Sequence, residues 1–436
     1  MNVGLISLGC AKNQVASEQM LFLLREAGHT LVTDETQADA IVINTCAFIE
    51  DAKQEAIDTI LETAKLKETA KLKKLIVTGC LAQLYKEQVT QELPEVDAIV
   101  GVGSYDEIVT VLDETFAGAG PCLIGPNGGP LCEVPRVVST GSVWAYLLIA
   151  EGCDNHCSYC IIPRIRGPFR SRSPENILDE ARTLAAAGYS EIILVAQDLT
   201  RYGRDLPGKP SLASLLTELC KTDGVKWIRL HYLYPNELND ELIEVIANEP
   251  KIVKYLDIPI QHINDTILKK MNRRDTSASI RALFKKLRAR IPSLVLRTSL
   301  ITGLPYENEA EFEELCEFLR EAKIERAGVF PFSPEEDTPA ADMPHVDSDT
   351  ARERAEKILE LQAEVMDEWE RSLIGSTVPV LCEDWDDERN LHVGRGYFDS
   401  PGIDGQVAFG GDCAIGEIKN VKILSAEDGE LMGETI

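Results

Sequence analysis

The stretch EGCDNHCSYCIIP, residues 151–163, decides how the rest of the chain is interpreted. It places Cys153, Cys157 and Cys160 on one short loop, in the spacing C-x3-C-x2-C. Three thiolates can hold three irons of a cubane cluster, which leaves the fourth iron open to a ligand that is not protein. A zinc ribbon would need a second C-x2-C pair, and the sequence has none. We therefore expect a 4Fe-4S cluster with an open iron, where chemistry takes place.

A second set of cysteines shares a different pattern. Cys10, Cys46 and Cys80 each end a short apolar run, in LISLGC, IVINTC and LIVTGC. Such runs indicate buried parallel strands, and the carboxyl ends of the strands in an open α/β sheet line one crevice. We expect the three thiols to meet there and hold a second cluster with an open iron; the alternative is three small buried hydrophobes. The other cysteines show no motif spacing and are interpreted as structural, with redox activity left open for two in the Gly/Pro-rich stretch, Cys122 and Cys132.

The alternation of apolar runs and helical patterns predicts an α/β protein of several parts. We expect a doubly wound parallel α/β domain over 1–120, a Gly/Pro-rich linker over 121–142, and a partial parallel (β/α)6 barrel over 143–345. A connecting helix over 346–375 and a small β-barrel over 376–436 complete the chain. The strands expected in the two α/β parts are Val3–Leu8, Ala40–Asn44, Leu75–Thr78 and Ala98–Val100, then Trp144–Ala150, Ile192–Ala196, Trp227–Tyr232, Val253–Ile258, Leu294–Ile301 and Gly328–Phe332.

The charge balance argues against a nucleic-acid backbone as partner. The 436 residues include 44 Lys and Arg against 72 Asp and Glu, a net charge of −28. A protein that binds phosphates needs clustered cations, so this chain suits a basic protein partner, or the charge serves only solubility. The chain has no apolar run long enough to span a membrane, its start lacks the basic region of a secretion signal, and its 12 cysteines suit a reducing compartment. We expect a cytoplasmic protein.

The whole chain resembles the radical S-adenosylmethionine methylthiotransferases, which join an N-terminal methylthiotransferase domain, a radical barrel and a C-terminal TRAM domain. One branch modifies the adenosine beside the tRNA anticodon; the other modifies an aspartate β-carbon in the twelfth ribosomal protein of the small subunit. The second branch is favoured by SLGCAKNQVASE, CIIPRIRGPFRSR, VAQDLTRYGRDL, WIRLHYLYP, YLDIPIQHINDTILKKMNRRDT and GRGYFDSPGIDGQV. Departures from its pattern are Ala16 in place of Asp, Tyr306 in place of Gly, and His231 where some members have Leu.

The resemblance implies two 4Fe-4S clusters and S-adenosylmethionine, which serves both as radical source and as methyl donor. The cluster at Cys153, Cys157 and Cys160 would cleave it to a deoxyadenosyl radical that takes hydrogen from the aspartate β-carbon. The cysteines of the N-terminal set would hold the cluster that presents sulfur, supplied as sulfide or polysulfide. Tyr159 would lie near the adenine, and flavodoxin or ferredoxin would supply electrons.

Several further residues become candidates for cofactor or substrate binding. Gln197, Asp198 and Tyr202 follow the second barrel strand, where the family binds the amino group of S-adenosylmethionine and the substrate; a carboxylate capping the next turn is the alternative. Arg229 and Arg297 lie on strands, where a charge is costly unless paired. Either a cofactor or substrate carboxylate or an internal salt bridge would pair them.

The remaining candidates lie beside the cysteine loop and at later strand ends. Gly303, with Pro305, indicates a tight turn near the adenine, and His262 is a weaker candidate for a base. Arginines form a basic island after the cysteine loop, and a bidentate guanidinium could hold the target carboxylate; packing against acidic neighbours is the alternative. The island comprises Arg164, Arg166, Arg170 and Arg172, of which the first two are the substrate candidates.

The C-terminal part tests the substrate class independently. Residues 376–436 hold 4 Lys or Arg against 13 Asp or Glu, and the run EDWDDE at 383–388 suits a basic protein better than RNA. A solvated acidic loop is the alternative. A tRNA methylthiotransferase, and an iron–sulfur scaffold or electron carrier, remain the competing functions.

Overall fold

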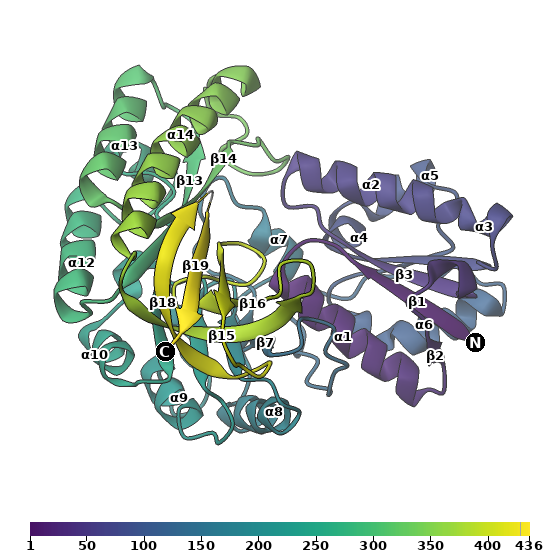
Figure 1. The fold of residues 1–436 in the computed structure, drawn as a ribbon. Coiled ribbons are helices and arrows are strands. Elements are labelled where there is room, and N and C mark those ends of the chain that lie inside the picture. Colours follow the sequence, from purple (N-terminus) through teal and green to yellow (C-terminus); the bar gives the residue numbers. More distant parts are fainter. Residues whose placement is uncertain (428) are drawn as a thin grey trace. The chain divides into compact units, whose positions relative to one another are not determined.

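The computed structural model describes residues 1–427 and 429–436, which form two compact units. The first unit comprises Met1–Ser139, Ala150–Arg172 and Glu335–Thr338, and the second comprises Thr140–Ile149, Ser173–Pro334 and Pro339–Ile436. The loop of Cys153, Cys157 and Cys160 therefore folds with the N-terminal unit, together with the short strand β8, Ala150–Glu151, although β7, Trp144–Leu148, belongs to the second unit. Figure 1 traces the chain from purple to yellow.

The first unit is built on a parallel sheet of six strands in the order β2-β1-β3-β4-β5-β6. Helices α1 and α6 cover one face, and α2, α4 and α5 cover the other (Figure 1), which confirms the doubly wound domain. The strands are β1 Asn2–Ser7, β2 Thr30–Leu31, β3 Ala40–Thr45, β4 Lys74–Gly79, β5 Ala98–Val100 and β6 Cys122–Leu123. The helices are α1 Ala11–Glu26, α2 Glu50–Ala64, α3 Leu66–Thr69, α4 Cys80–Leu84, α5 Lys86–Glu92 and α6 Ile108–Phe116, with 3-10 turns η1 Glu35–Gln37 and η2 Tyr105–Glu107.

The stretch expected to be a linker packs against this unit. Its strand β6 pairs with β5, and further along the Val137 amide donates to the Glu18 carbonyl at 3.0 Å. Buried Glu18 also binds the side chain of Arg136 and accepts from the Ser139 amide at 2.8 Å. A buried carboxylate requires such partners. Arg136 and Ser139 lie so far from Glu18 in the sequence that the composition of this stretch could not predict the contacts.

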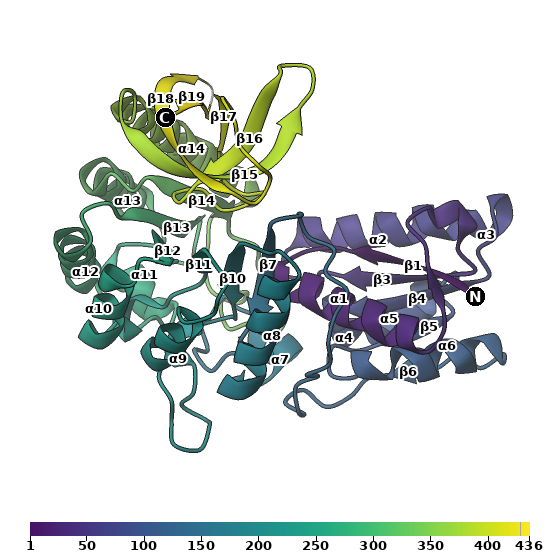
Figure 2. The same ribbon diagram turned by 60° about the horizontal axis from the view of Figure 1, so that its bottom comes forward.

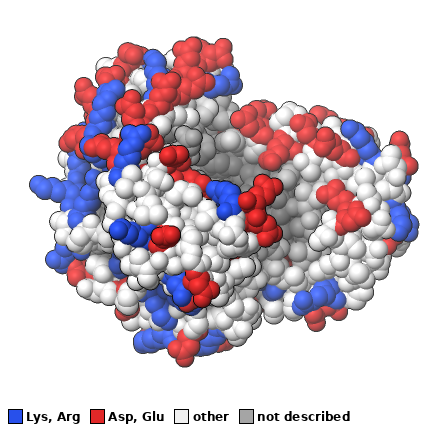
Figure 3. Space-filling model, in the orientation of Figure 1, with Lys and Arg blue, Asp and Glu red and all other residues white. Residues whose placement is uncertain are grey.

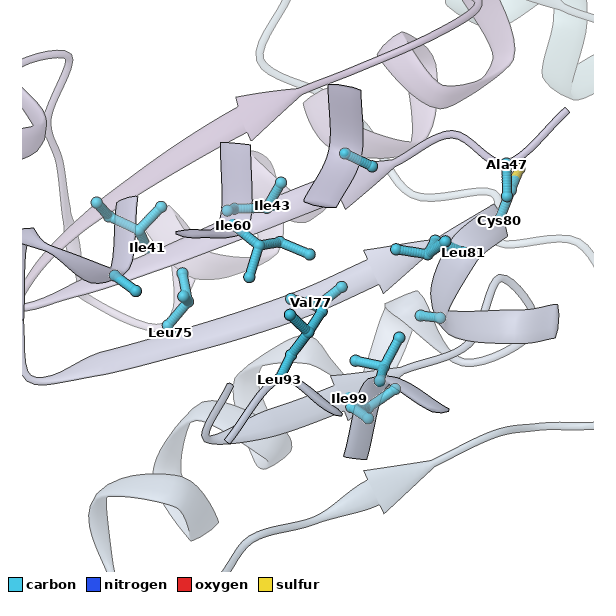
Figure 4. Close-up of a cluster of buried hydrophobic side chains, with 14 of the residues drawn as sticks. Ile41, Ile43, Ala47, Ile60, Leu75, Val77, Cys80, Leu81, Leu93 and Ile99 are labelled. Atoms are coloured by element: carbon cyan, nitrogen blue, oxygen red, sulfur yellow. The ribbon is translucent and has the colours of Figure 1, made fainter. Parts of the chain in front are cut away.

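The core between the sheet and α2 consists of aliphatic side chains from adjacent strands. Ile41 and Ile43 of β3 pack beside Leu75 and Val77 of β4, with Ile60 of α2 over them (Figure 4). Strands buried on both faces are continuous apolar runs, which is why the sequence marked them clearly. In Figure 4 Cys80 lies at the carboxyl end of the strands, at the opposite end of this core from Ile41 and Leu75.

The second unit contains a parallel sheet of six strands in the order β14-β13-β12-β11-β10-β7, open between β14 and β7, as expected for a partial barrel. Helices cover its outer side (Figure 2). The strands are β7 Trp144–Leu148, β10 Glu191–Val195, β11 Trp227–Leu230, β12 Ile252–Asp257, β13 Val295–Thr302 and β14 Arg326–Pro331. The helices are α8 Pro174–Ala186, α9 Leu212–Leu219, α10 Asp240–Asn248, α11 Asp265–Lys270, α12 Ser277–Arg290 and α13 Glu309–Ala322, with η3 Leu199–Arg201 and η4 Pro235–Glu237.

The same unit ends in a long helix and a closed antiparallel-rich barrel. Helix α14, Ser348–Ser372, begins after the cap Asp347 and leads into the barrel β15-β16-β17-β19-β18. The barrel core packs on Trp227, Val253 and Val295, which lie at the starts of the parallel strands. Within the described residues, no helix is long and apolar enough to cross a membrane. The barrel strands are β15 Thr377–Asp386, β16 Leu391–Gly396, β17 Gln406–Gly410, β18 Ile418–Glu427 and β19 Glu430–Thr435.

Candidate functional site

The three N-terminal cysteines lie where their strands end. Cys46 directly follows β3, Cys10 caps α1, and Cys80 is the first residue of α4. The glycine before each of the last two has positive φ, +87° at Gly9 and +95° at Gly79, so the chain turns sharply from strand into helix. A Cβ on Gly9 would lie 2.8 Å from the Cβ of Cys46 and 3.1 Å from its Sγ, so two of the three loops are in close contact.

Asn13 ties the three loops together. Its Nδ2 donates to the carbonyl of Leu8 at 2.9 Å and to that of Thr45 at 3.0 Å, one at the end of β1 and one at the end of β3. Its Oδ1 lies 3.9 Å from Cys80 Sγ, at the end of β4. The structure therefore brings together the three cysteines that the sequence grouped, and Asn13 is a residue of this site that the sequence analysis did not single out.

The three thiols influence one another's ionisation. Burial, together with the neighbouring Cys80 and Cys10, raises the pKa of Cys46 to about 11. Burial also raises the pKa of Cys80, against the favourable charge of Arg166. The surrounding protein disfavours the Cys10 thiolate as well, but the charges of Lys12 and Arg166 bring its pKa below the ordinary value. The raised pKa values of Cys46 and Cys80 keep these two thiols protonated until a metal binds, since a coordinating thiol is deprotonated outright.

The second set of cysteines is held on a short, constrained loop. The Cys153 amide donates to the Gly167 carbonyl at 3.1 Å, and the Cys160 amide donates to the Cys157 carbonyl at 3.0 Å. All three cysteines are free thiols and half-buried. In the described residues no three side chains of His, Cys, Asp or Glu gather closely enough for a single metal ion. A cubane spreads its thiolates over separate irons, and each set supplies three free thiols for such a cluster.

Helix α7, Ile162–Arg166, joins the two sets of cysteines within the first unit. It begins two residues after Cys160, and Ile161 and Ile165 are buried in the core that contains Cys80. Arg166, which the sequence offered as a substrate ligand, is buried and binds Glu151 and the Oδ1 of Asn13. Its Nη2 lies 3.6 Å from Cys80 Sγ. The structure thus places this arginine against the N-terminal cysteines.

The other three arginines of the basic island have separate partners. Arg164 is half-exposed and pairs with Asp337. Arg170 donates to the carbonyls of Gly129 at 2.6 Å and Arg166 at 2.8 Å, and Arg172 lies 3.5 Å from Glu133. The contacts of Arg164 and Arg172 correspond to the packing against acidic neighbours that the sequence left as the alternative, whereas Arg170 binds backbone carbonyls.

Asp198 and Gln197, which follow β10, differ in their hydrogen bonding. Asp198 is buried and caps η3, since its Oδ1 accepts from the Thr200 amide at 3.0 Å. This matches the capping alternative. The Oε1 of Gln197 is buried and has no hydrogen-bond partner among the described residues, which leaves it available to a ligand. Tyr202 is buried, and half-buried Tyr159 lies on the cysteine loop of the first unit.

The two strand arginines have internal partners. Arg229 is fully buried, with Nε 2.6 Å from Glu191 and Nη1 donating to the Tyr397 carbonyl at 2.8 Å. Burial disfavours the Glu191 carboxylate, but Arg229 and Arg395 hold its pKa below the usual value. Arg297 lies 3.0 Å from Asp257. Both arginines therefore make the internal salt bridges that the sequence offered as the alternative to a cofactor carboxylate.

Gly303 has a packing reason to be glycine. Its φ is +75°, and a Cβ there would lie 2.5 Å from the Cβ of Ala351 on α14. Its amide donates to Glu307 at 2.8 Å, and the same buried carboxylate lies 3.4 Å from His262 and 2.8 Å from Arg354. Glu307 organises this turn, and the sequence analysis overlooked it because a lone Glu after GLPY carries no spacing signal.

Comparison with protein families defines the class of enzyme. Three family models match in order: UPF0004, an uncharacterized protein family, over residues 2–101; the radical SAM superfamily over 147–319; and the TRAM domain over 374–436. The cysteine loop and strands β10 to β13 of the partial barrel lie inside the second match, which begins within β7 and ends before β14. The fold and the site thus define a radical S-adenosylmethionine enzyme, joined here to a second three-cysteine site.

Full-length relatives narrow the class further. The chain is 48% identical over 441 residues to ribosomal protein uS12 methylthiotransferase RimO of Geobacter sulfurreducens, covering 100% of this chain and 98% of the relative. It is 47% identical to the protein of that name from Lachnoclostridium phytofermentans, over 99% of each. The chain belongs to the family of ribosomal protein uS12 methylthiotransferases.

Solved structures support the fold. The radical S-adenosylmethionine methyltransferase TsrM of Kitasatospora setae, with cobalamin and a 4Fe-4S cluster bound, matches with a TM-score of 0.57 at 14% identity. The match covers 78% of this chain and 77% of that one. At this identity the likeness extends to the fold alone.

Proposed function

We propose that the chain transfers a methylthio group to the β-carbon of an aspartate in ribosomal protein uS12. The observation that carries this proposal is the 48% identity to relatives of that name along the full chain. The two three-cysteine sites of the first unit support it, because hydrogen abstraction and sulfur transfer at one carbon need two reactive centres.

The residues of the two sites have distinct roles in this proposal. Cys153, Cys157 and Cys160 hold one 4Fe-4S cluster, and Cys10, Cys46 and Cys80 hold the other. When bound, the two clusters and S-adenosylmethionine supply the radical, the sulfur and the methyl group, with sulfide or polysulfide as the sulfur source. The buried Oε1 of Gln197 is a ready acceptor for the amino group of S-adenosylmethionine.

The charge of the C-terminal barrel favours a protein substrate over tRNA. Three of its four cations are engaged by carboxylates: Arg395 lies 2.5 Å from Glu191, Arg389 lies 2.6 Å from Asp386, and Lys419 lies 2.9 Å from Glu417. Lys422 is the fourth, so few charges remain for phosphates. On the face drawn in Figure 3, blue side chains are dispersed among red ones, with no continuous basic surface over its described residues.

The acidic end of the β15–β16 hairpin is the surface that we assign to the basic partner. Asp384, Asp387 and Glu388 are exposed there, next to Trp385, which is 39% exposed. Aromatic side chains flanked by charges are common in protein interfaces. A cytoplasmic location and an electron donor such as flavodoxin or ferredoxin complete the proposal.

A competition assay tests the substrate. The protein is reconstituted anaerobically with iron and sulfide, given S-adenosylmethionine and a reductant, and offered uS12 and unmodified tRNA together. We expect a methylthio adduct on an aspartate of uS12 by mass spectrometry. An adduct on tRNA alone would mean that tRNA, and not uS12, is the substrate. A protein that never forms 5′-deoxyadenosine would instead be a scaffold or electron carrier.

Single replacements of the six cysteines test the two sites. Cys46→Ala should abolish methylthiolation while 5′-deoxyadenosine still forms, and Cys157→Ala should abolish both. Cys122→Ser, at an exposed cysteine of edge strand β6, is the matched control and should keep both activities. Full methylthiolation by Cys46→Ala would contradict the scheme of two clusters.

A further inference from the structure

Arg166 is a buried cation with an unusual set of partners. Its side chain is 3% exposed, and Nη1 pairs with the carboxylate of Glu151. Nη2 donates to Asn13 Oδ1 and lies 3.6 Å from Cys80 Sγ. A buried guanidinium needs a countercharge, which Glu151 supplies, so the contact with sulfur is additional to what neutralisation requires.

Asn13 makes the arrangement specific. Its Nδ2 is occupied by the carbonyls of Leu8 and Thr45, so the amide orientation is fixed and its Oδ1 faces Arg166. The carboxylate and the amide oxygen together hold the guanidinium from two directions. The guanidinium of Arg166 is therefore held in one orientation, with Nη2 toward Cys80, and is not free to turn toward a substrate.

The chain connects this arginine directly to the other cysteine loop. Arg166 is the last residue of α7, which begins two residues after Cys160. Buried Ile161 and Ile165 anchor the helix in the core shared with Cys80 and Ala47. A substitution at Arg166 therefore affects the N-terminal cysteines through its direct contact with Cys80. It reaches Cys160 only through helix α7.

We propose that Arg166, oriented by Glu151 and Asn13, is a positioning residue that donates a charged hydrogen bond to the Cys80 thiolate when the N-terminal cysteines hold their cluster. This inference rests on the proposed cluster at that site. Hydrogen bonds and positive charge at cluster sulfurs stabilise the reduced cluster and raise its reduction potential. Arg166 therefore sets the potential of the sulfur-presenting cluster independently of the radical-forming one.

The test uses the full-length reconstituted chain with Cys153, Cys157 and Cys160 replaced by Ala, so that only the N-terminal cluster remains. Arg166→Met removes the charge and the donor but keeps the apolar stem. Because the neutral side chain leaves Glu151 unpaired, Arg166→Lys, which keeps the charge, and the double change Arg166→Met with Glu151→Gln are measured beside it. Arg164→Met is the matched control, since Arg164 lies on the same helix and pairs with Asp337 at the surface.

The readouts are iron per chain, thermal unfolding and the midpoint potential by redox titration monitored by electron paramagnetic resonance. We expect the midpoint to shift to lower potential in Arg166→Met and in the double variant, less in Arg166→Lys, and not at all in Arg164→Met. An unchanged midpoint and spectrum in the folded double variant would overturn the inference. So would Arg166→Met in the chain that keeps all six cysteines, if it retained the parental N-terminal cluster signal and showed only a raised KM for uS12, which would make Arg166 a substrate ligand.

Failure of the proposed function is distinguishable from failure of this inference. If the parental chain with the three Ala replacements binds no iron, the N-terminal cluster itself is wrong. If it binds iron and the double variant titrates at the same potential, the cluster stands and the role of Arg166 does not.

Discussion

Gly9 and Gly79 show how single residues set the geometry of the N-terminal cysteines. Each has a φ near +90° immediately before its cysteine, a conformation that side chains with a Cβ adopt only with strain. At Gly79 the space is also filled, because a Cβ would lie 2.4 Å from the Oδ1 of Asn44 and 2.4 Å from the carbonyl of Thr45. The LGC and TGC sequences therefore form the sharp turns that position Cys10 and Cys80.

Gly79→Ala should damage the N-terminal site far more than backbone strain alone predicts. Gly28→Ala is the matched control, because Gly28 has φ +87° with nothing within 4 Å of its Cβ position. We expect the control to lose about 1 kcal/mol of unfolding free energy and Gly79→Ala to lose about 3 kcal/mol or more, from strain plus displaced neighbours. Urea denaturation measures the stability. Iron per chain should fall by half in Gly79→Ala only, and equal effects of the two changes would contradict the steric argument.

The sequence was least informative about contacts between individual side chains. The six cysteines could be grouped because they recur at strand ends or at a fixed spacing. The partner of Arg166 could not be predicted, because Asn13 is 153 positions away and neither residue belongs to a periodic pattern. Arg229 and Arg297 were recognised as charges that need partners, but only the fold shows that Glu191 and Asp257 provide them.

At the scale of elements, apolar runs predicted the strands well because they are buried on both faces. The expected strand at Ala98–Val100 has those bounds, and the other expected strands lie within a few residues of theirs. The edge strands β2 and β6 have two residues each, too few for a periodic signal. Helix α7 is five residues long, and its docking depends on Ile161 and Ile165 meeting a distant core.

The long helix α14 provides a test of element stability. Its cap Asp347 accepts from the Thr350 amide at 2.9 Å, which satisfies one of the free amides of the first turn. Asp347→Ala should lower the free energy of unfolding by about 1 kcal/mol. Asp349→Ala is the control, since Asp349 only pairs with exposed Arg352 at 3.3 Å, and it should change stability by less than about 0.5 kcal/mol. Urea titration followed by circular dichroism compares the two, and similar losses would mean that the cap is not the cause.

At the scale of the whole molecule, the chain's three family regions do not coincide with its two compact units. The loop of Cys153, Cys157 and Cys160 lies inside the radical SAM match yet folds with the N-terminal unit. Both sets of three cysteines thus belong to one compact unit, and a single unit can fix the separation between them. The sequence grouped the cysteines into two sets but gave no means of predicting that both sets belong to one compact unit.

The net charge of −28 leads to a prediction about association with the basic substrate. Long-range attraction is screened by salt, with a Debye length of about 10 Å at 0.1 M, so kcat/KM for uS12 should fall about tenfold or more between about 0.05 M and 0.5 M NaCl. Formation of 5′-deoxyadenosine without uS12 should change little over this range, because it does not require the encounter with the basic protein. Measuring both rates in the same buffers separates loss of steering from general inhibition.

The acidic hairpin should account for part of that salt dependence. Replacing exposed Asp384, Asp387 and Glu388 by their amides removes three charges while keeping side-chain size. This variant should show a lower kcat/KM at low salt, a shallower salt dependence and an unchanged kcat, because the charges act on encounter rather than on chemistry. A control in which Asp51, Glu55 and Asp58 of α2 become amides carries the same loss of net charge at a different surface. If both variants lose the same salt dependence, the attraction comes from the overall charge; a loss confined to the hairpin variant assigns the docking surface to the C-terminal barrel.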